Sequence, residues 1–137
     1  MRPLTVVRPP QAALTILAAI LALVACCGAQ DATFHTAPAA DAAAKNPYQS
    51  SPAAAAAGKK LYGQNCAQCH GNNLQGMGPA PALDTPAVKT AKPGELYWFI
   101  STGDLNKGMP NWSSLPKQQR WQIVTFLQTK SGSSGAK

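Results

Sequence analysis

The chain of 137 residues is rich in alanine and poor in charge. Hydrophobic residues make up 45% of it, but 25 residues are alanine, whose small side chain buries little apolar surface. Only 12% of the residues are charged, against about 25% in an average soluble protein. Lys and Arg outnumber Asp and Glu by 12 to 5, which gives a formal net charge of +7. These figures predict one small domain and exclude a large enzyme with a self-sufficient core.

The first 29 residues have the order of an export signal. Arg2 and Arg8 precede an apolar run over residues 12–24, and small residues follow that run. A permanent transmembrane helix is the alternative, but the run is shorter than the roughly 20 residues that cross a bilayer core. We therefore expect residues 1–29 to direct export to the periplasm or cell envelope.

Residues 23–26 resemble the lipobox of bacterial lipoproteins, in which apolar and small residues precede a cysteine that becomes acylated. Processing before Cys26 would give a lipid-modified N-terminus and attach the protein to a membrane. Cleavage after Ala29 would instead release a soluble protein. We expect lipidation of Cys26, and ordinary cleavage stays open as the alternative.

Residues 30–51 are predicted to form a flexible tether. The segment is mostly Ala, Pro, Asp, Ser, Thr and Gln, and its only large apolar residues are Phe34 and Tyr48. These are too few to offset the entropy of ordering the segment. His35 lies among small and polar residues and is assigned no role. The folded domain is expected over residues 52–130, followed by a disordered Ser/Gly-rich tail over 131–137.

Three helices are predicted inside this domain, and no segment has the two-residue alternation of a strand. Ser51 is the expected N-cap and Pro52 the first residue of a helix that leads into Cys66. The second helix starts at Pro93 and ends before Gly103. The third follows Pro116 and has apolar residues three and four positions apart, which are Trp121, Ile123, Val124, Phe126 and Leu127.

Cys66, Cys69 and His70 form a C-x-x-C-H motif, the signature of covalent attachment of a c-type haem. Two thiols at this spacing can reach the two vinyl groups on one edge of a porphyrin, and the adjacent histidine then lies under the iron as an axial ligand. A redox disulfide and half of a zinc site are the alternatives. The first is typical of a βαβ context, and the second needs another pair of ligands, which this domain lacks.

Two methionines of the domain are candidates for the sixth ligand of the iron. Met77 follows the histidine by only seven positions, so the chain would have to wrap abruptly around the ring to reach its other face. Met109 lies between Gly108 and Pro110 in a long connection between the second and third helices. Such a connection can cover the distal face, so Met109 is the predicted ligand and an open sixth site is the alternative.

These residues resemble the class I mono-haem cytochromes c of bacteria. The resemblance covers nearly all of the domain, through GKKLYGQNCAQCHG (58–71), Gly-Pro (78–79), LYWFISTG (96–103), KGMPNW (107–112) and RWQIVTFLQ (120–128). It implies an all-α cytochrome c fold in which short helices surround one covalently bound haem c. It further implies that the first helix crosses the last, that Gly58 permits their close approach, and that Tyr62 meets the apolar stripe near Trp121 and Val124.

The resemblance also implies roles around the haem. The carbonyl of Pro79 would accept the Nδ1 proton of His70 and orient its imidazole. Trp98 would pack toward the haem, and Trp112 would lie near its edge or a propionate. For both tryptophans, core packing is the main role that we expect.

The predicted function is one-electron transfer in the cell envelope, between a dehydrogenase or respiratory complex and an oxidase. Ligation by His70 and Met109 would saturate the iron, which argues against a peroxidase. The alternatives are an electron-transfer subunit of a larger oxidoreductase and a haem-based gas or redox sensor in which Met109 is displaced. No catalytic residues and no small-molecule substrate are predicted.

An excess of positive charge in the domain predicts redox partners with acidic docking surfaces. Nucleic acid is not expected as a partner of an exported haem domain. Eight cations face three carboxylates between residues 53 and 130: Lys59, Lys60, Lys89, Lys92, Lys107, Lys117, Arg120 and Lys130 against Asp84, Glu95 and Asp104.

Overall fold

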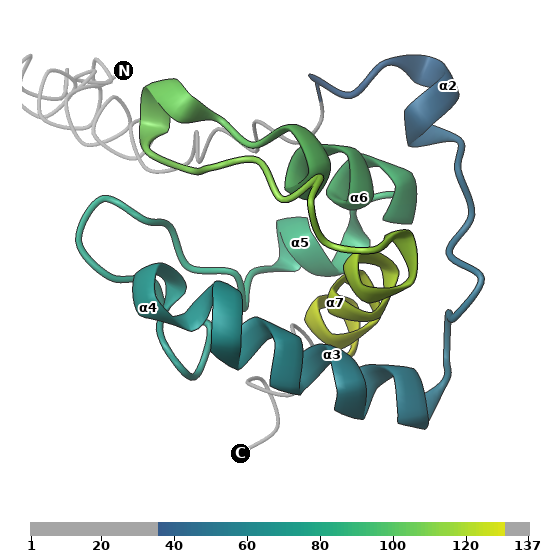
Figure 1. Ribbon diagram of the computed structural model, residues 1–137, viewed down its shortest axis with the longest axis horizontal. Coiled ribbons are helices and arrows are strands. Elements are labelled where there is room, and N and C mark those ends of the chain that lie inside the picture. Colours follow the sequence, from purple (N-terminus) through teal and green to yellow (C-terminus); the bar gives the residue numbers. More distant parts are fainter. Residues whose placement is uncertain (1–35, 131–137) are drawn as a thin grey trace, which may run out of the picture. The chain divides into compact units, whose positions relative to one another are not determined.

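The computed structural model of the chain describes residues 36–130. The predicted export signal with Cys26, His35 and the tail over 131–137 lie outside the described residues. The helices are α2 (Ala39–Ala42), α3 (Pro52–Asn65), α4 (Ala67–His70), α5 (Pro86–Thr90), α6 (Pro93–Thr102), the 3-10 helix η2 (Leu105–Lys107) and α7 (Lys117–Lys130) (Figure 1). Between residues 36 and 130 the β-structure is limited to two isolated bridges, Met77 with Ala80 and Asp104 with Met109. The predicted all-α class is confirmed.

The three predicted helices are α3, α6 and α7, and local signals explain where they begin and end. The Ser51 hydroxyl accepts a hydrogen bond from the Ala54 amide at the start of α3. At the start of α6 the Glu95 carboxylate accepts one from the Lys92 amide, 3.0 Å away. Gly103, with φ +67°, ends the same helix. A carboxylate at a helix N-terminus and a glycine at its end are both stabilising.

The core of the domain lies where α3 crosses α7 (Figure 1). A side chain at Gly58 would place its Cβ 1.9 Å from the Gln122 carbonyl oxygen and 2.9 Å from the Phe126 Cβ. The two helices therefore approach as closely as predicted, because position 58 carries no side chain. Tyr62 is buried and its ring centroid lies 5.3 Å from that of Phe126, whereas Trp121 stacks on Tyr97 of α6. Tyr62 thus meets the apolar stripe of α7 as predicted, through the ring of Phe126, whereas Trp121 contacts α6.

The predicted flexible tether over residues 30–51 is wrong for residues 36–50, which form a strap packed on α6 and α7. Asn46 is only 6% exposed, and its side-chain amide donates a hydrogen bond of 2.9 Å to the Thr125 hydroxyl on α7. Helix α2 lies on α6, where a Cβ on Gly94 would meet the Asp41 carbonyl oxygen at 2.1 Å. The folded part therefore starts well before residue 52. Small residues let the strap lie close to the helices, and the buried side-chain amide of Asn46 attaches it to α7. Few large apolar groups are therefore needed to order the strap.

No helix within residues 36–130 combines the length and the apolar character needed to span a bilayer.

Candidate functional site

The two thiols of the C-x-x-C-H motif lie one turn apart at the joint between α3 and α4. Cys66 ends α3 and begins α4, and its carbonyl oxygen accepts hydrogen bonds from the amides of Cys69 (3.1 Å) and His70 (2.9 Å). Both cysteines are free, with Cys66 half-buried and Cys69 exposed. The helical turn places both thiols and the imidazole on one short element. Within residues 36–130, no three side chains of His, Cys, Asp or Glu gather into a set that could hold a metal ion.

The chemistry of Cys66 argues against a redox dithiol. Burial, with a smaller contribution from the neighbouring Cys69, raises the pKa of Cys66 from 9.0 to about 11. A catalytic dithiol needs the opposite shift, because the thiolate is the attacking species. Cys66 therefore lacks the lowered pKa that the attacking thiol of a thioredoxin-like centre needs.

His70 is oriented by a backbone carbonyl, but the carbonyl belongs to Pro81. The Nδ1 atom of His70 lies 2.9 Å from the Pro81 oxygen. The predicted partner, Pro79, is wrong, because residues 77–80 form a tight turn in which the amide and carbonyl of Met77 pair with those of Ala80. Pro79 therefore lies exposed at the tip of the turn, and the chain returns to His70 two residues later. With Nδ1 as donor to this carbonyl, Nε2 is the free ligand atom of the ring.

The loop over residues 71–85, called the histidine loop below, is folded by left-handed residues. Gly71 has φ +78° and Gly76 φ +77°, and a Cβ on Gly76 would lie 2.7 Å from the Ala82 amide nitrogen. Leu74 also has a positive φ of 65°, and its buried side chain and carbonyl oxygen hold the loop together. The buried Tyr62 hydroxyl donates a 2.6 Å hydrogen bond to the Gly71 carbonyl. This loop delivers the Pro81 carbonyl to His70.

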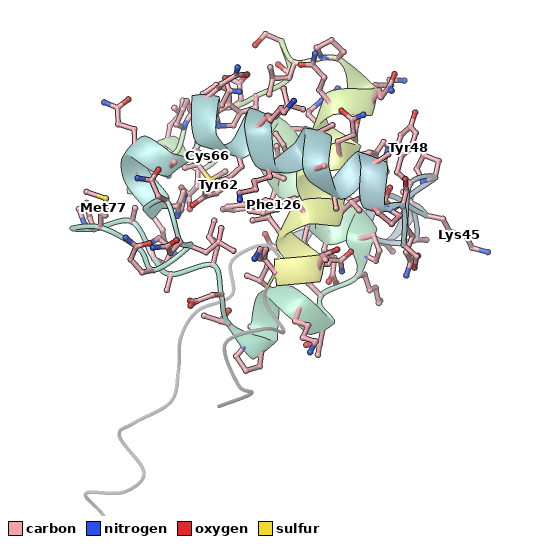
Figure 2. All side chains as sticks on the ribbon, turned by 90° about the horizontal axis from the view of Figure 1, so that it is seen from below. Lys45, Tyr48, Tyr62, Cys66, Met77 and Phe126 are labelled. Atoms are coloured by element: carbon pink, nitrogen blue, oxygen red, sulfur yellow. The ribbon has the colours of Figure 1, made fainter. Side chains whose placement is uncertain are left out.

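The two candidate methionines differ in exposure and in place. Met77 is 53% exposed and lies at the outer tip of the histidine loop, as Figure 2 shows. Met109 is half-buried in the connection over residues 103–116, called the methionine loop below. Asp104 and Met109 exchange both backbone hydrogen bonds at 2.9 Å, which closes the tip of that loop around η2. In Figure 1, α4 and the green segment around η2 extend from the helices toward the same side of the view.

The two tryptophans assigned to the haem surroundings lie in different places. Trp112 is half-buried and packs against the core cluster, and its amide donates to the Ile100 carbonyl at 3.0 Å. Trp98 is also half-buried and lines a surface hollow together with Thr36 of the strap and Phe99. Of the two, only Trp112 packs against the buried core around Tyr62 and Ile123, against which Cys66 also packs.

Sequence reasoning missed two residues of this region. Pro81 could have been found from Gly78-Pro79, a dipeptide typical of a turn that redirects the chain. Arg120 was counted as a surface charge, but it is only 8% exposed. The signal was its place in the first turn of a helix, where a cation is unfavourable unless other contacts hold it.

Comparison with known families decides the identity of this fold and motif. The family model described as cytochrome C oxidase, cbb3-type, subunit III matches residues 53–127, more than half of the chain. The chain belongs to this family. It is a c-type cytochrome, as the C-x-x-C-H motif predicted. No curated protein and no solved structure gives a significant match.

The donor set of this c-type cytochrome fits a haem c. Two unpaired thiols one turn apart, followed by an imidazole whose Nδ1 is already engaged, are the groups that the porphyrin edge and the iron require. Cys66 and Cys69 would hold the ring, and His70 would bind the iron through Nε2. The cofactor supplies an iron that gains and releases one electron.

Proposed function

We propose that this c-type cytochrome is a one-electron carrier of the cell envelope, with one covalently attached haem c ligated by His70 and Met109. The observation that carries the proposal is the 2.9 Å contact between His70 Nδ1 and the Pro81 oxygen, which fixes the ring and leaves Nε2 for the iron. Met109 supports it, because its loop is closed on itself and its side chain is half-buried, whereas Met77 is exposed.

The residues of the chain would favour electron transfer in two ways. They restrict movement of the His70 imidazole, and they restrict access of small ligands to the iron. Hydrogen bonding to the Pro81 carbonyl increases the basicity of the His70 imidazole. A thioether from Met109, as the second protein ligand, would favour the reduced state relative to a second imidazole. The sequence has no other histidine than His35 and His70, so His35 is the only further imidazole that a peroxidase-like acid–base step could use.

Spectra of the holoprotein test the ligands. The oxidised wild type should have the weak long-wavelength methionine–iron band, and the reduced protein should not bind carbon monoxide. Met109→Ala should abolish the band and open the reduced haem to carbon monoxide, while the matched variant Met77→Ala should behave as wild type. Loss of the band in Met77→Ala and its survival in Met109→Ala would contradict the assignment. Carbon monoxide binding by the wild type would favour the sensor.

Acidic surfaces on redox partners are the second part of the proposal. Seven lysines between residues 53 and 130 support it; the buried Arg120 does not add to the surface charge. The exposed Lys107 lies on η2, within the methionine loop. Long-range attraction accelerates encounter and weakens with salt. Electron-transfer rates with a physiological partner should therefore fall as ionic strength rises, and rates that stay constant would remove this part.

Membrane attachment through a lipidated Cys26 is the third part. Cys26 precedes the first described residue, Thr36, by ten positions, and a chain of that length spans at most roughly 35 Å. Cells expressing wild type and Cys26→Ser should be fractionated, and the wild type should be membrane-bound and carry a lipid mass increment. Haem protein in the soluble periplasm for both forms, without that increment, would contradict the anchor.

A subunit of a larger oxidoreductase is the second candidate, and the description of the matched family as an oxidase subunit favours it. Mild detergent extraction followed by size-exclusion chromatography separates the two functions. A carrier should elute as a small haem protein, whereas a subunit should co-elute with other redox proteins in fixed stoichiometry.

A further inference from the structure

Arg120 is a buried cation at a position that does not favour one. It lies in the first turn of α7, close to the positive end of the helix dipole, and it is only 8% exposed. A charge removed from water is tolerated only when good hydrogen bonds replace its hydration. Its contacts therefore indicate what this residue is there to hold.

The contacts of Arg120 join the two stems of the methionine loop. Its Nε donates a 3.1 Å hydrogen bond to the Leu115 carbonyl, just before α7. Its Nη1 donates to the Ser101 hydroxyl in the last turn of α6, and its Cζ lies 4.7 Å from the centre of the Tyr97 ring. One guanidinium thus connects the end of α6, where the loop begins, with the residues just before α7, where the loop ends.

Other bonds across this loop are few and come from its backbone. Trp112 donates to the Ile100 carbonyl at 3.0 Å, and the pair Asp104 and Met109 closes the tip. Met109 belongs to the pair at the tip, so the path of its backbone depends on how the stems are held. The planar guanidinium, with donors in fixed directions, suits this task better than a flexible ammonium group.

We propose that Arg120 is a positioning residue for Met109: by joining the stems of the methionine loop it keeps the thioether in reach of the haem iron. The proposal rests on the function proposed above, in which Met109 is the sixth ligand. Arg120 itself does not touch the reacting atom. Loss of its bonds should leave the haem attached, because Cys66, Cys69 and His70 lie on another element, but should let Met109 dissociate more often.

Arg120→Met and Arg120→Lys in the holoprotein test the proposal. Dissociation of Met109 limits binding of carbon monoxide to the reduced haem, so Arg120→Met should bind the gas at concentrations at which the wild type does not, with the fraction of open haem raised about tenfold or more, the change expected for loss of a charged hydrogen bond. Arg120→Lys keeps the charge but cannot join both stems, so it should show most of this effect. Ser101→Ala, which removes one contact and keeps Arg120, should show a smaller effect in the same direction.

Gln128→Ala is the matched control for a purely structural role. The Gln128 side chain also connects α7 to a distant backbone carbonyl, that of Ala91, at 3.0 Å. This variant should lower the melting temperature without changing the methionine–iron band or carbon monoxide binding.

Each outcome decides the question. A normal band and wild-type carbon monoxide binding in Arg120→Met, or a change equal to that of Gln128→Ala, would overturn the role of Arg120. If Arg120→Met does not fold, Ser101→Ala decides by the same readouts, and unchanged binding there overturns the proposal. If Met109→Ala leaves the wild-type band intact, the ligand assignment itself fails, and the role of Arg120 is overturned with it.

Discussion

The histidine loop and the methionine loop carry the two candidate ligands, and they are held in different ways. The histidine loop starts directly at α4 and is shaped by its own backbone, through the left-handed Gly71, Leu74 and Gly76 and the turn at 77–80. The methionine loop is closed at its tip by the isolated bridge between Asp104 and Met109, and Arg120 of α7 connects its stems. The histidine loop is thus fixed mainly by its own conformation, with one bond from Tyr62 of α3, whereas the stems of the methionine loop are joined by a side chain of α7.

This difference follows from where each loop lies relative to the attachment motif. His70 is the last residue of α4, so a short loop of defined backbone conformation can bring Pro81 back to it. Met109 lies 39 positions further along the chain, and its place depends on how α6 and α7 pack. A loop held by packing is easier to displace than one attached to the motif.

The largest effects on the two loops are expected from substitution of one glycine in each of them. Gly76→Ala and Gly103→Ala each place a Cβ within 2.7 Å of backbone atoms at a positive φ, so each should lower the free energy of unfolding by about 3 kcal/mol. Gly103→Ala should also remove the methionine–iron band. Gly76→Ala should leave the band but weaken the contact between the histidine loop and the His70 imidazole. Chemical denaturation and spectra of the holoprotein measure both effects.

Gly63→Ala is the control for these two variants, because position 63 is an exposed site in α3 with no atom within 4 Å of an added Cβ. It should stabilise the protein by about 0.5–1 kcal/mol, since alanine is the better helix former. Equal spectra for Gly76→Ala and Gly103→Ala would contradict the separate roles of the two loops.

The strap gives a third region, which should affect stability without affecting either ligand. Asn46→Ala removes the bond to Thr125 and the acceptor for the Tyr48 amide, both at 2.9 Å, and should cost about 2 kcal/mol. Lys45→Ala, at a neighbouring exposed residue whose side chain projects outward in Figure 2, should cost less than about 0.5 kcal/mol. A change in the methionine–iron band of Asn46→Ala would show that the strap also acts on the ligands.

Tyr62 should have a smaller and pH-dependent effect on the histidine loop. Burial, followed by the charge of Cys66 in the haem-free chain and that of Asp84, raises the pKa of Tyr62 from 10.0 to about 12. Between these values the unfolded chain releases the phenol proton while the folded chain keeps it, so this stabilisation is complete below pH 10 and is lost as the pH rises toward 12. Tyr62→Phe should cost about 1 kcal/mol at neutral pH through the lost bond to Gly71.

The same variant should lose less stability than wild type between pH 10 and 12, as measured by urea denaturation at each pH. Tyr48→Phe, on the strap, is the matched control and should follow the wild-type profile. Parallel profiles for Tyr62→Phe and wild type would show that the buried phenol does not titrate as expected.

Pro79→Ala should have the smallest effect, because Pro79 is exposed at the turn and Pro81 supplies the carbonyl to His70. We expect a change of less than about 0.5 kcal/mol and an unchanged Nδ1 proton resonance of His70 in the reduced holoprotein. A shifted resonance would indicate that Pro79 still contributes to the orientation of the ring.

Much of the fold was predictable because its signals are local. Ser51 with Pro52, Pro93 with Gly103, and the apolar stripe of α7 each act within a few residues, so the three main helices were predicted close to their observed ends. The C-x-x-C-H motif is local as well, and the family match agrees with it. Gly58 was predicted as a close contact only through the resemblance.

By itself, the sequence determined the three long helices α3, α6 and α7, the attachment motif and the assignment to the c-type cytochromes, since each depends on neighbours along the chain. Only the tertiary structure decided that Pro81 rather than Pro79 reaches His70, that Asn46 ties the strap to α7, and that Arg120 is buried between the stems of the methionine loop. Asn46 and Arg120 contact residues 79 and 19 positions away, respectively. The sequence around a polar residue is the same whether its side chain is exposed to solvent or buried. Packing of helices that are distant along the chain decides which of the two occurs.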